Sequence, residues 1–237
     1  MRSGVKSDIM KSRDGPADWT VSLFLFLSPC RGMTRPSESG RSAARRGEDR
    51  PPGVNSSGGN TAMEEYWDLY DGRLRPTGRT HPRRRALAYG DYHLVVFAWA
   101  LREDGRVLMT RRAPQKSYSG FYECTGGCAF AGETPALAAT RELREETGLE
   151  LENPFLARVC RRVDDFAFTY IFRAPLSAQP RPQSGETVAP EWLTPDRYAA
   201  LLAEGRVVPS ASNLPALLDA LNAGRPLYEN LLAGTCL

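Results

Sequence analysis

The chain has 237 residues, of which 41% are hydrophobic, and its formal net charge is +3. This length can hold one domain plus a tail, and the composition changes at Met63 in the way that such a division predicts. Residues 1–62 carry ten Lys or Arg and six Asp or Glu, whereas the remaining 175 residues carry 21 basic and 22 acidic side chains. The basic charge therefore belongs to the leader, and it gives no argument for nucleic-acid binding by the domain.

Residues 1–62 are rich in Arg, Ser, Gly and Pro, a composition that is typical of disordered segments. Their apolar segment, residues 19–27, is too short to span a membrane, and no small-residue cleavage site of a signal peptide follows it. We therefore expect a disordered leader that is not part of the native product, with synthesis beginning at Met63. Peptides from residues 2–60 in mass spectra of the protein from its natural host would contradict this hypothesis.

The five cysteines are scattered along a chain that is long enough to build its own core. An odd, scattered set is not typical of a disulfide framework, so we expect a reducing cytoplasm. Cys124 and Cys128 have the spacing of half a zinc site. No second Cys or His pair follows at ligand spacing, which argues against zinc.

From Met63 onward we expect an ordered lead-in over residues 63–89, with a turn at Asp71 and Gly72, and then the main domain over residues 90–237. The strands that we expect are residues 91–101, 107–110, 121–125, 154–162 and 166–173. Asp104 and Gly105 predict a tight hairpin between the first two strands, because Asp-Gly readily adopts positive backbone angles. A polar loop is expected at residues 113–120 and a Pro-rich loop at residues 174–190.

Three helices are expected. Thr134 followed by Pro135 is a helix start, with a capping hydroxyl and a proline where no donor is missed, and Gly148 is a helix stop. A second helix begins at Thr194, and a third covers residues 214–222. Sheet segments around one helix, with further helices at the end, predict a mixed α/β sandwich.

The first helix carries three glutamates, Glu142, Glu145 and Glu146, whose i, i+3 and i+4 spacing places them on one face. Crowded carboxylates repel one another, so the arrangement is costly unless cations occupy this face, and hard oxygen ligands suit Mg²⁺ or Mn²⁺. The alternative is a solvated acidic face. An adjacent apolar stripe is expected to pack against the sheet, and it consists of Ala136, Ala139 and Leu143.

Residues 127–149 resemble the signature of the Nudix hydrolases, the MutT-like family, at every fixed position. These positions are Gly127, Glu133, Arg141, Glu142, Leu143, Glu145, Glu146, Gly148 and Leu149. The resemblance covers roughly residues 90–202 and implies a Nudix-type α/β/α sandwich, in which the signature forms a loop–helix–loop unit on a mixed sheet.

The resemblance implies a cytoplasmic, metal-dependent enzyme that hydrolyses the diphosphate of a nucleoside diphosphate linked to another moiety. It assigns Glu142, Glu145 and Glu146 to Mg²⁺ or Mn²⁺, with the carbonyl of Gly127 as a further ligand. Either Glu142 or Glu146 is expected to take the proton from water, because crowding by like charges raises a carboxyl pKa. The expected partner is a small diphosphate substrate, with no nucleic acid and no membrane, and a homodimer is left open.

Several residues around the signature have expected supporting roles. Glu133 and Arg141 are expected to pair and to hold the helix against the loop. Arg112 and Lys116, with Arg111 less favoured, are candidates for phosphate binding, although exposed cations are usually only solvated. Candidates for a further metal ligand, or else ordinary surface carboxylates, are Asp164, Asp165 and Glu186.

Two other functions remain as alternatives. The lead-in, with His81 and His93, resembles the region before the Nudix-type domain of isopentenyl diphosphate isomerase. However, Gly126 stands where that enzyme has its active cysteine, and Cys128 replaces a metal-binding histidine, so hydrolysis is favoured and both histidines are expected to be structural. A catalytically silent nucleotide-binding module is disfavoured because the helix keeps all its glutamates. The motif does not determine the substrate.

Overall fold

The structure is a computed structural model that describes residues 64–181 and 187–224, so the predicted leader lies outside the described part. The described elements, in chain order, are β1 (Tyr66–Tyr70), β2 (Pro76–Pro82), β3 (His93–Arg102), β4 (Val107–Arg112), β5 (Tyr122–Glu123), β6 (Thr125–Cys128), α2 (Pro135–Thr147), β7 (Phe155–Arg161), β8 (Asp165–Ala174), β9 (Thr187–Leu193), α3 (Pro195–Ala203), the 3₁₀-helix η1 (Pro209–Ala211) and α4 (Leu214–Asn222). The mixed α/β sandwich expected from the sequence is confirmed.

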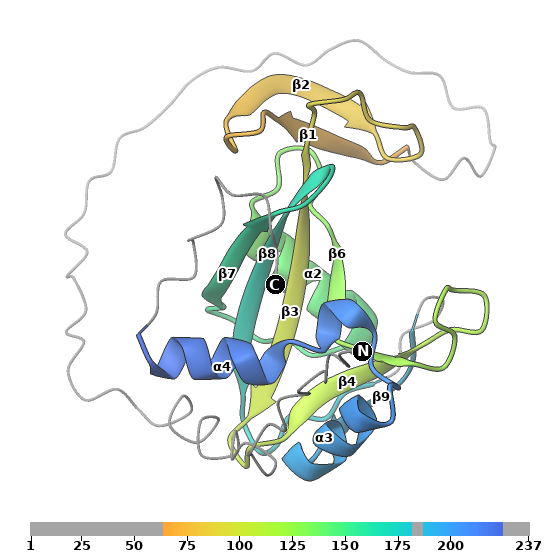
Figure 1. Cartoon of the computed structure of the whole chain (residues 1–237), viewed down its shortest axis with the longest axis vertical. Helices are drawn as coiled ribbons and strands as arrows, with labels where there is room; N and C mark the ends of the chain where they lie inside the picture. The colour runs from red at the N-terminus through yellow and green to blue at the C-terminus, as the bar shows by residue number, and fades with distance from the viewer. Residues whose placement is uncertain (1–63, 182–186, 225–237) are drawn as a thin grey trace, which may run out of the picture.

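A seven-stranded sheet forms the middle layer, with the order β5-β4-β3-β8-β7, while β6 pairs with β3 and β9 pairs with β4. The β3–β8 pair is parallel and the β3–β6 pair is antiparallel, so the sheet is mixed. Helix α2 lies behind the sheet and α4 lies in front of it (Figure 1). No helix in the described ranges is long and apolar enough to cross a membrane.

Alternate residues of the central strand β3 are buried on opposite faces of the sheet. Val96 and Ala98 belong to the core beneath α2, whereas Trp99 belongs to the core shared with α3 and α4. Both faces are covered because side chains of a strand alternate in direction and nearly every residue of β3 is apolar.

Helix α2 begins and ends where the sequence predicts. The Thr134 hydroxyl accepts a hydrogen bond from the Leu137 N–H at 3.3 Å, and Gly148 closes the last turn with φ 68°. The predicted apolar stripe packs against the core, with Ala139 and Leu143 fully buried and Ala136 half-buried beside them. Ala138, which the prediction did not include, is also fully buried.

Three segments differ from the sequence prediction. The lead-in forms an antiparallel hairpin of β1 and β2, and the strand expected at residues 121–125 is divided at Cys124 into β5 and β6. The predicted loop at residues 174–190 is wrong at its end, because β9 already begins at Thr187 and pairs with β4. Pro190 makes this strand hard to predict from the sequence, because proline is unfavourable in most strands. It is tolerated there because β9 is an edge strand with an irregular register.

The β1–β2 hairpin lies at one end of the sheet and contacts the loop that leads into α2 (Figure 1). The Tyr66 carbonyl accepts a hydrogen bond from the Ala131 N–H at 2.8 Å, and Asp68 Oδ2 accepts one from the Gly132 N–H at 2.7 Å. Trp67 stacks on His93 with 3.9 Å between ring centroids. The hairpin therefore holds this loop from outside the sheet.

Candidate active site

The centre of the candidate site is the contact between Glu142 of α2 and Gly127 of β6. Strand pairing places Gly127 opposite Val96 of β3, beneath the helix. A Cβ atom on Gly127 would overlap the Glu142 carboxylate, and even the farther oxygen, Oε2, would lie only 2.6 Å away. Only glycine leaves room at this position for the carboxylate against the strand backbone.

Glu146 lies one helical turn farther along, in a largely buried position beside Thr125, with which it forms a hydrogen bond. Burial, together with the negative charges of Glu142 and Glu123, raises the pKa of the Glu146 carboxyl to about 8, against the smaller lowering effects of Lys116 and Thr125. Burial likewise raises the pKa of Glu142, against the opposing effect of Arg141. The site thus concentrates carboxylates where water cannot stabilise their charge.

The three signature glutamates are not equivalent. The Glu142 side chain is 15% exposed, whereas the Glu145 side chain is 52% exposed. Both carboxylates accept hydrogen bonds from Arg141 Nη1, at 2.9 Å and 3.1 Å respectively. Glu142 and Glu146 therefore form the buried part of the predicted acidic face, and Glu145 stands at its solvent edge.

Arg141 connects the helix to the signature loop. Its guanidinium binds both oxygens of Glu133 at 2.9 Å, donates to the Cys128 carbonyl at 2.9 Å and lies 4.0 Å from the centre of the Phe130 ring. Glu133 Oε2 also accepts a hydrogen bond from the Phe130 N–H at 3.0 Å. The expected pairing of Glu133 and Arg141 is present, with a geometry that fixes the loop against α2.

A divalent cation fits this donor set. The carboxylates of Glu142 and Glu146 and the backbone of Gly127 offer hard oxygen atoms of the kind that Mg²⁺ and Mn²⁺ prefer. Within residues 64–181 and 187–224, no three His, Cys, Asp or Glu side chains already form a metal-binding group. Arg141 instead supplies the positive charge next to Glu142 and Glu145, so a metal assignment for these residues stays a prediction.

The two predicted phosphate-binding cations lie in different surroundings. Arg112 forms an ion pair with Glu123, and its Nε donates to the Ser117 carbonyl at 2.6 Å, so it anchors the loop after β4. The charge of Lys116 lowers the pKa of Glu146, which places the ammonium group near the carboxylates. Phosphate binding stays a prediction for both residues.

Glu123 and Thr125 are parts of the site that the sequence prediction missed. Glu123 is brought near Glu146 by the pairing of β5 with β4, in which it lies opposite Thr110. This pairing joins segments that are apart in the sequence, so no short motif predicts it. The alternation of side chains along a strand places Glu123 and Thr125 on the same face, but the strand is too short for this pattern to predict a site.

The further metal ligands proposed from the sequence stay predictions. Asp165 is buried, and Arg162 binds both of its oxygens at 2.6 Å. Asp164 is exposed, and Glu186 lies outside the described residues. A carboxylate already held by a guanidinium at two points must give up that ion pair before it can bind a metal.

The histidine and cysteine side chains occupy structural surroundings. His93 is buried against Trp67, and His81 Nε2 lies 3.2 Å from the Arg85 carbonyl. Cys124 is a free thiol in the hydrophobic core, and burial raises the pKa of the free thiol of Cys128 to about 11.

The buried carboxyl of Glu146 predicts an unusual pH dependence for the metal-free protein. Its pKa is about 8 in the folded state against an ordinary value of 4.5, so between these values the folded state holds a proton that the unfolded state releases. The free energy of unfolding should therefore fall as the pH rises from about 5 to 8. Thermal melts in a chelator should show a lower Tm at pH 8, and Glu146→Gln should flatten this decline. An equal decline in both proteins would contradict the assignment.

Comparisons with known proteins identify the family of the chain. The family model of the NUDIX domain matches residues 91–213. A MutT-like protein of Streptomyces ambofaciens is 35% identical over 126 residues, which cover 53% of this chain and 75% of that protein. An uncharacterised Nudix hydrolase of Listeria monocytogenes is 37% identical over 92 residues, which cover 38% of this chain and 54% of that protein.

Among solved structures, DR0079 from Deinococcus radiodurans has a TM-score of 0.50 and 25% sequence identity, and the match covers 65% of this chain and 98% of that one. This likeness supports the mixed α/β fold over the part of the chain that it covers. Because the family model spans more than half of the 237 residues, the chain belongs to the Nudix family and is a hydrolase that acts on phosphoanhydrides.

Proposed function

We propose that the protein is a metal-dependent pyrophosphohydrolase that cleaves the diphosphate of a nucleoside diphosphate linked to another moiety. The observation that carries this proposal is the packing of the Glu142 carboxylate against Gly127, beside the buried carboxyl of Glu146. Two carboxyl groups buried beside a glycine backbone lower the stability of the fold, because their charge is removed from water. They are useful if cations and a phosphate group occupy the space beside them.

In this proposal Glu142, Glu145, Glu146 and the Gly127 carbonyl hold Mg²⁺ or Mn²⁺. When bound, these ions would neutralise the negative charge on the diphosphate oxygens. Lys116, near Glu146, contributes a further positive charge for the diphosphate. Arg141 and Glu133 keep the loop and the helix in register, so the carboxylates do not need to reorganise during the reaction.

The chemical step is attack of water on phosphorus. A new bond forms between the water oxygen and phosphorus, the bond from phosphorus to the bridging oxygen breaks, and the bridging oxygen leaves with the other phosphate group. Glu146 is the favoured acceptor of the water proton, because Arg141 binds Glu142 directly and already engages that carboxylate.

We place the protein in the cytoplasm, with a small diphosphate compound as its substrate. A homodimer stays a prediction that the mass of the purified protein in solution would test. The relationship of the lead-in to isopentenyl diphosphate isomerase also stays a prediction. The glycine at position 126 and the stacking of buried His93 on Trp67 favour hydrolysis over isomerisation.

The purified protein should release a mononucleotide or phosphate from at least one compound in a panel of ADP-ribose, UDP-glucose, NADH and coenzyme A when Mg²⁺ is present. Addition of EDTA should abolish the release, because without a bound cation nothing at the anionic carboxylates neutralises the negative charge of the diphosphate. Isopentenyl diphosphate is tested in parallel for isomerisation. Isomerisation without hydrolysis would support the isomerase alternative, and nucleotide binding without any turnover would support the silent module.

A further inference from the structure

The β1–β2 hairpin lies outside residues 91–213, the part of the chain that the NUDIX family model matches, yet it contacts the signature loop. This loop, residues 129–133, joins β6 to the start of α2. Its tip, Ala131 and Gly132, is exposed to solvent, and Gly132 has φ 79°. The order of an exposed loop tip depends on fixed hydrogen-bond partners for its backbone groups.

Backbone N–H groups at the two ends of the loop donate to the sheet or to the loop itself. The Ala129 N–H donates to the Leu94 carbonyl of β3 at 3.0 Å. The Phe130 N–H donates to Glu133 Oε2 at 3.0 Å, and the Glu133 N–H donates to the Phe130 carbonyl at 2.9 Å. These bonds fix the ends of the loop, so the tip needs partners from elsewhere.

The hairpin supplies the partners of the tip. The Ala131 N–H donates to the Tyr66 carbonyl at 2.8 Å, and the Gly132 N–H donates to Asp68 Oδ2 at 2.7 Å. The second bond is charge-assisted, because its acceptor is a carboxylate, and such bonds are stronger than those between neutral groups. Asp68 is therefore the hairpin side chain that holds the tip of the loop.

The hairpin is itself fixed to the sheet, which lets it hold the loop in one place. Tyr70 and Tyr92 exchange backbone hydrogen bonds of 2.8 Å and 2.9 Å just before β3. Trp67 stacks on buried His93 with 9° between the ring planes, and Leu69 is buried in the core beneath. The hairpin is thus a rigid support for the loop.

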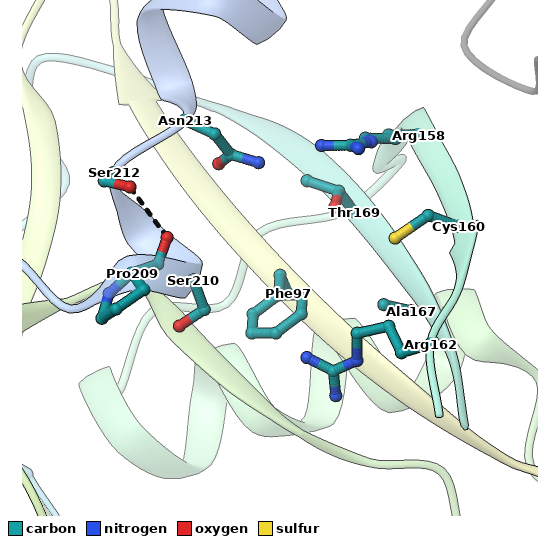
Figure 2. Close-up of a pocket in the computed structure, with 10 residues that line it drawn as sticks. All are labelled: Phe97, Arg158, Cys160, Arg162, Ala167, Thr169, Pro209, Ser210, Ser212 and Asn213. Atoms are coloured by element: carbon teal, nitrogen blue, oxygen red, sulfur yellow. Dashed lines mark hydrogen bonds between the residues drawn. The ribbon is translucent and has the colours of Figure 1, made fainter. Parts of the chain in front are cut away.

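The sheet also borders a cavity of about 280 Å³, which lies between β3, β7, β8 and the segment that joins η1 to α4 (Figure 2). Within the described part of the chain, no residue of the hairpin lines this cavity. The hairpin is therefore connected to the candidate active site through the signature loop and not through this cavity.

A short series of contacts leads from the loop tip to the carboxylates. Glu133 follows Gly132 directly, and both of its oxygens bind the Arg141 guanidinium at 2.9 Å. Arg141 Nη1 in turn donates to Glu142 Oε1 at 2.9 Å. A displacement of the tip would therefore move the guanidinium that orients the Glu142 carboxylate.

We propose that the β1–β2 hairpin is part of the active site, with Asp68 as a positioning residue that keeps the signature loop in the geometry needed for cation binding. The inference rests on the proposed metal-dependent hydrolysis, and it adds to that site a residue from outside the matched family domain. Asp68 acts through the loop and Arg141 on Glu142, and not on the substrate itself. Partners that orient a metal ligand from outside contribute to metal affinity as well as to activity.

Asp68→Ala should raise the Mg²⁺ concentration for half-maximal rate by on the order of 10-fold, the lower end of the usual contribution of such outer partners. At saturating Mg²⁺, the KM for the diphosphate compound should change less than about 3-fold, because no substrate contact is removed. Asp68→Asn keeps an acceptor oxygen and should restore most of the loss. A lower Tm with an unchanged Mg²⁺ requirement would mean that the contact is merely structural, and would overturn the proposal.

The matched control is Asp71→Ala, at an aspartate of the same hairpin. Asp71 accepts hydrogen bonds from the N–H groups of Arg73 at 2.8 Å and Arg75 at 3.0 Å, so it stabilises the hairpin turn. This variant should keep the Mg²⁺ requirement within about 2-fold of wild type, as for an ordinary surface substitution. An equal rise in Asp68→Ala and Asp71→Ala would show a general effect of hairpin stability and overturn the role of Asp68.

A double-mutant cycle tests the path of the effect. Glu133→Gln weakens the link between the loop and Arg141. In that background Asp68→Ala should change the Mg²⁺ requirement less than about 3-fold, because two residues that act through one path are not additive. If the two losses instead multiplied in full, Asp68 would not act through Glu133.

Hydrogen exchange of the metal-free protein tests the contact without catalysis. The peptide that contains residues 129–133 should exchange faster in Asp68→Ala than in wild type, Asp68→Asn or Asp71→Ala, because the Gly132 N–H loses its acceptor. Calorimetric titration with Mn²⁺ should show weaker binding in Asp68→Ala alone among these proteins. Unchanged exchange, or faster exchange with wild-type Mn²⁺ affinity and rate, overturns the positioning role and leaves the hydrolase intact. If wild type neither binds Mn²⁺ nor hydrolyses any compound, the proposed function fails, while the exchange comparison still decides whether Asp68 fixes the loop.

Discussion

Glu146→Gln should reduce kcat at saturating Mg²⁺ by on the order of 10³-fold, while the protein remains folded. The amide cannot accept the proton of the attacking water, and it is a weaker ligand for a cation than the carboxylate. The side chain keeps its size, so packing beside Thr125 is retained. In the absence of metal the variant should even unfold at a higher temperature at pH 8, because a buried carboxylate that is costly to ionise has been removed.

The matched control is Glu150→Gln, which changes an exposed glutamate just after α2 and should alter kcat less than 2-fold, about the effect of an ordinary surface substitution. Initial rates of nucleotide release as a function of Mg²⁺ concentration check both variants. Circular dichroism confirms that they are folded. If Glu146→Gln kept most of its activity at any Mg²⁺ concentration, Glu146 would be neither the base nor an essential ligand.

The parts of the fold that the sequence predicts well are those with local causes. Helix α2 is predicted to the residue because its start depends on Thr134 and Pro135 and its end on Gly148, all within the segment itself. Strand β9 was missed because Pro190 is unfavourable in strands generally and is accommodated here only by pairing at the sheet edge. The β1–β2 hairpin was likewise missed as a pair of strands, since its stability depends on contacts with a loop more than 60 positions away, such as Asp68 with Gly132.

For the candidate site, the sequence identifies the signature glutamates but not how buried each of them is or which residues surround them. The spacing of Glu142, Glu145 and Glu146 predicts a shared face, yet it does not predict that Glu145 turns toward solvent. Arg141 contacts both Glu142 and Glu145 from within the same helix, whereas only Glu142 packs against the backbone of Gly127. Glu123 could not be found from the motif at all, because a non-local strand pair brings it near Glu146.

The position of Arg141 suggests how the metal-free site avoids a larger electrostatic cost. Its guanidinium compensates Glu142 and Glu145 while Glu133 holds it in place, so the carboxylates are not left with only each other. Burial strengthens this effect, because Coulomb interactions are less screened there than in water. A cation that binds at Glu142 therefore competes with an internal positive charge, and Glu145, being the more exposed partner, is the carboxylate that can most easily change its contacts.

Gly127→Ala is the most specific test of the geometry. The added methyl group would lie within 2.6 Å of both carboxylate oxygens of Glu142, whereas real Cβ contacts are essentially never below 3.0 Å. The atoms in conflict are at the end of a flexible side chain, so the carboxylate can move aside and the fold should survive. A displacement of about 1 Å in a reacting group can cost on the order of 10²-fold in rate, and we expect a loss of at least that order in kcat/KM.

The control is Gly72→Ala, because a Cβ atom there meets only ordinary van der Waals contacts, at 3.6 Å and beyond, with Tyr92 and Arg161. Gly72→Ala should keep wild-type activity, while Gly127→Ala should combine a nearly unchanged Tm with weakened Mg²⁺ dependence of the rate. This combination separates displacement of a ligand from general loss of structure, which would lower Tm and activity together. Wild-type activity in Gly127→Ala would mean that the Glu142 carboxylate does not work from its position against the strand, and the metal site would then have to be sought at Glu145 and Glu146 alone.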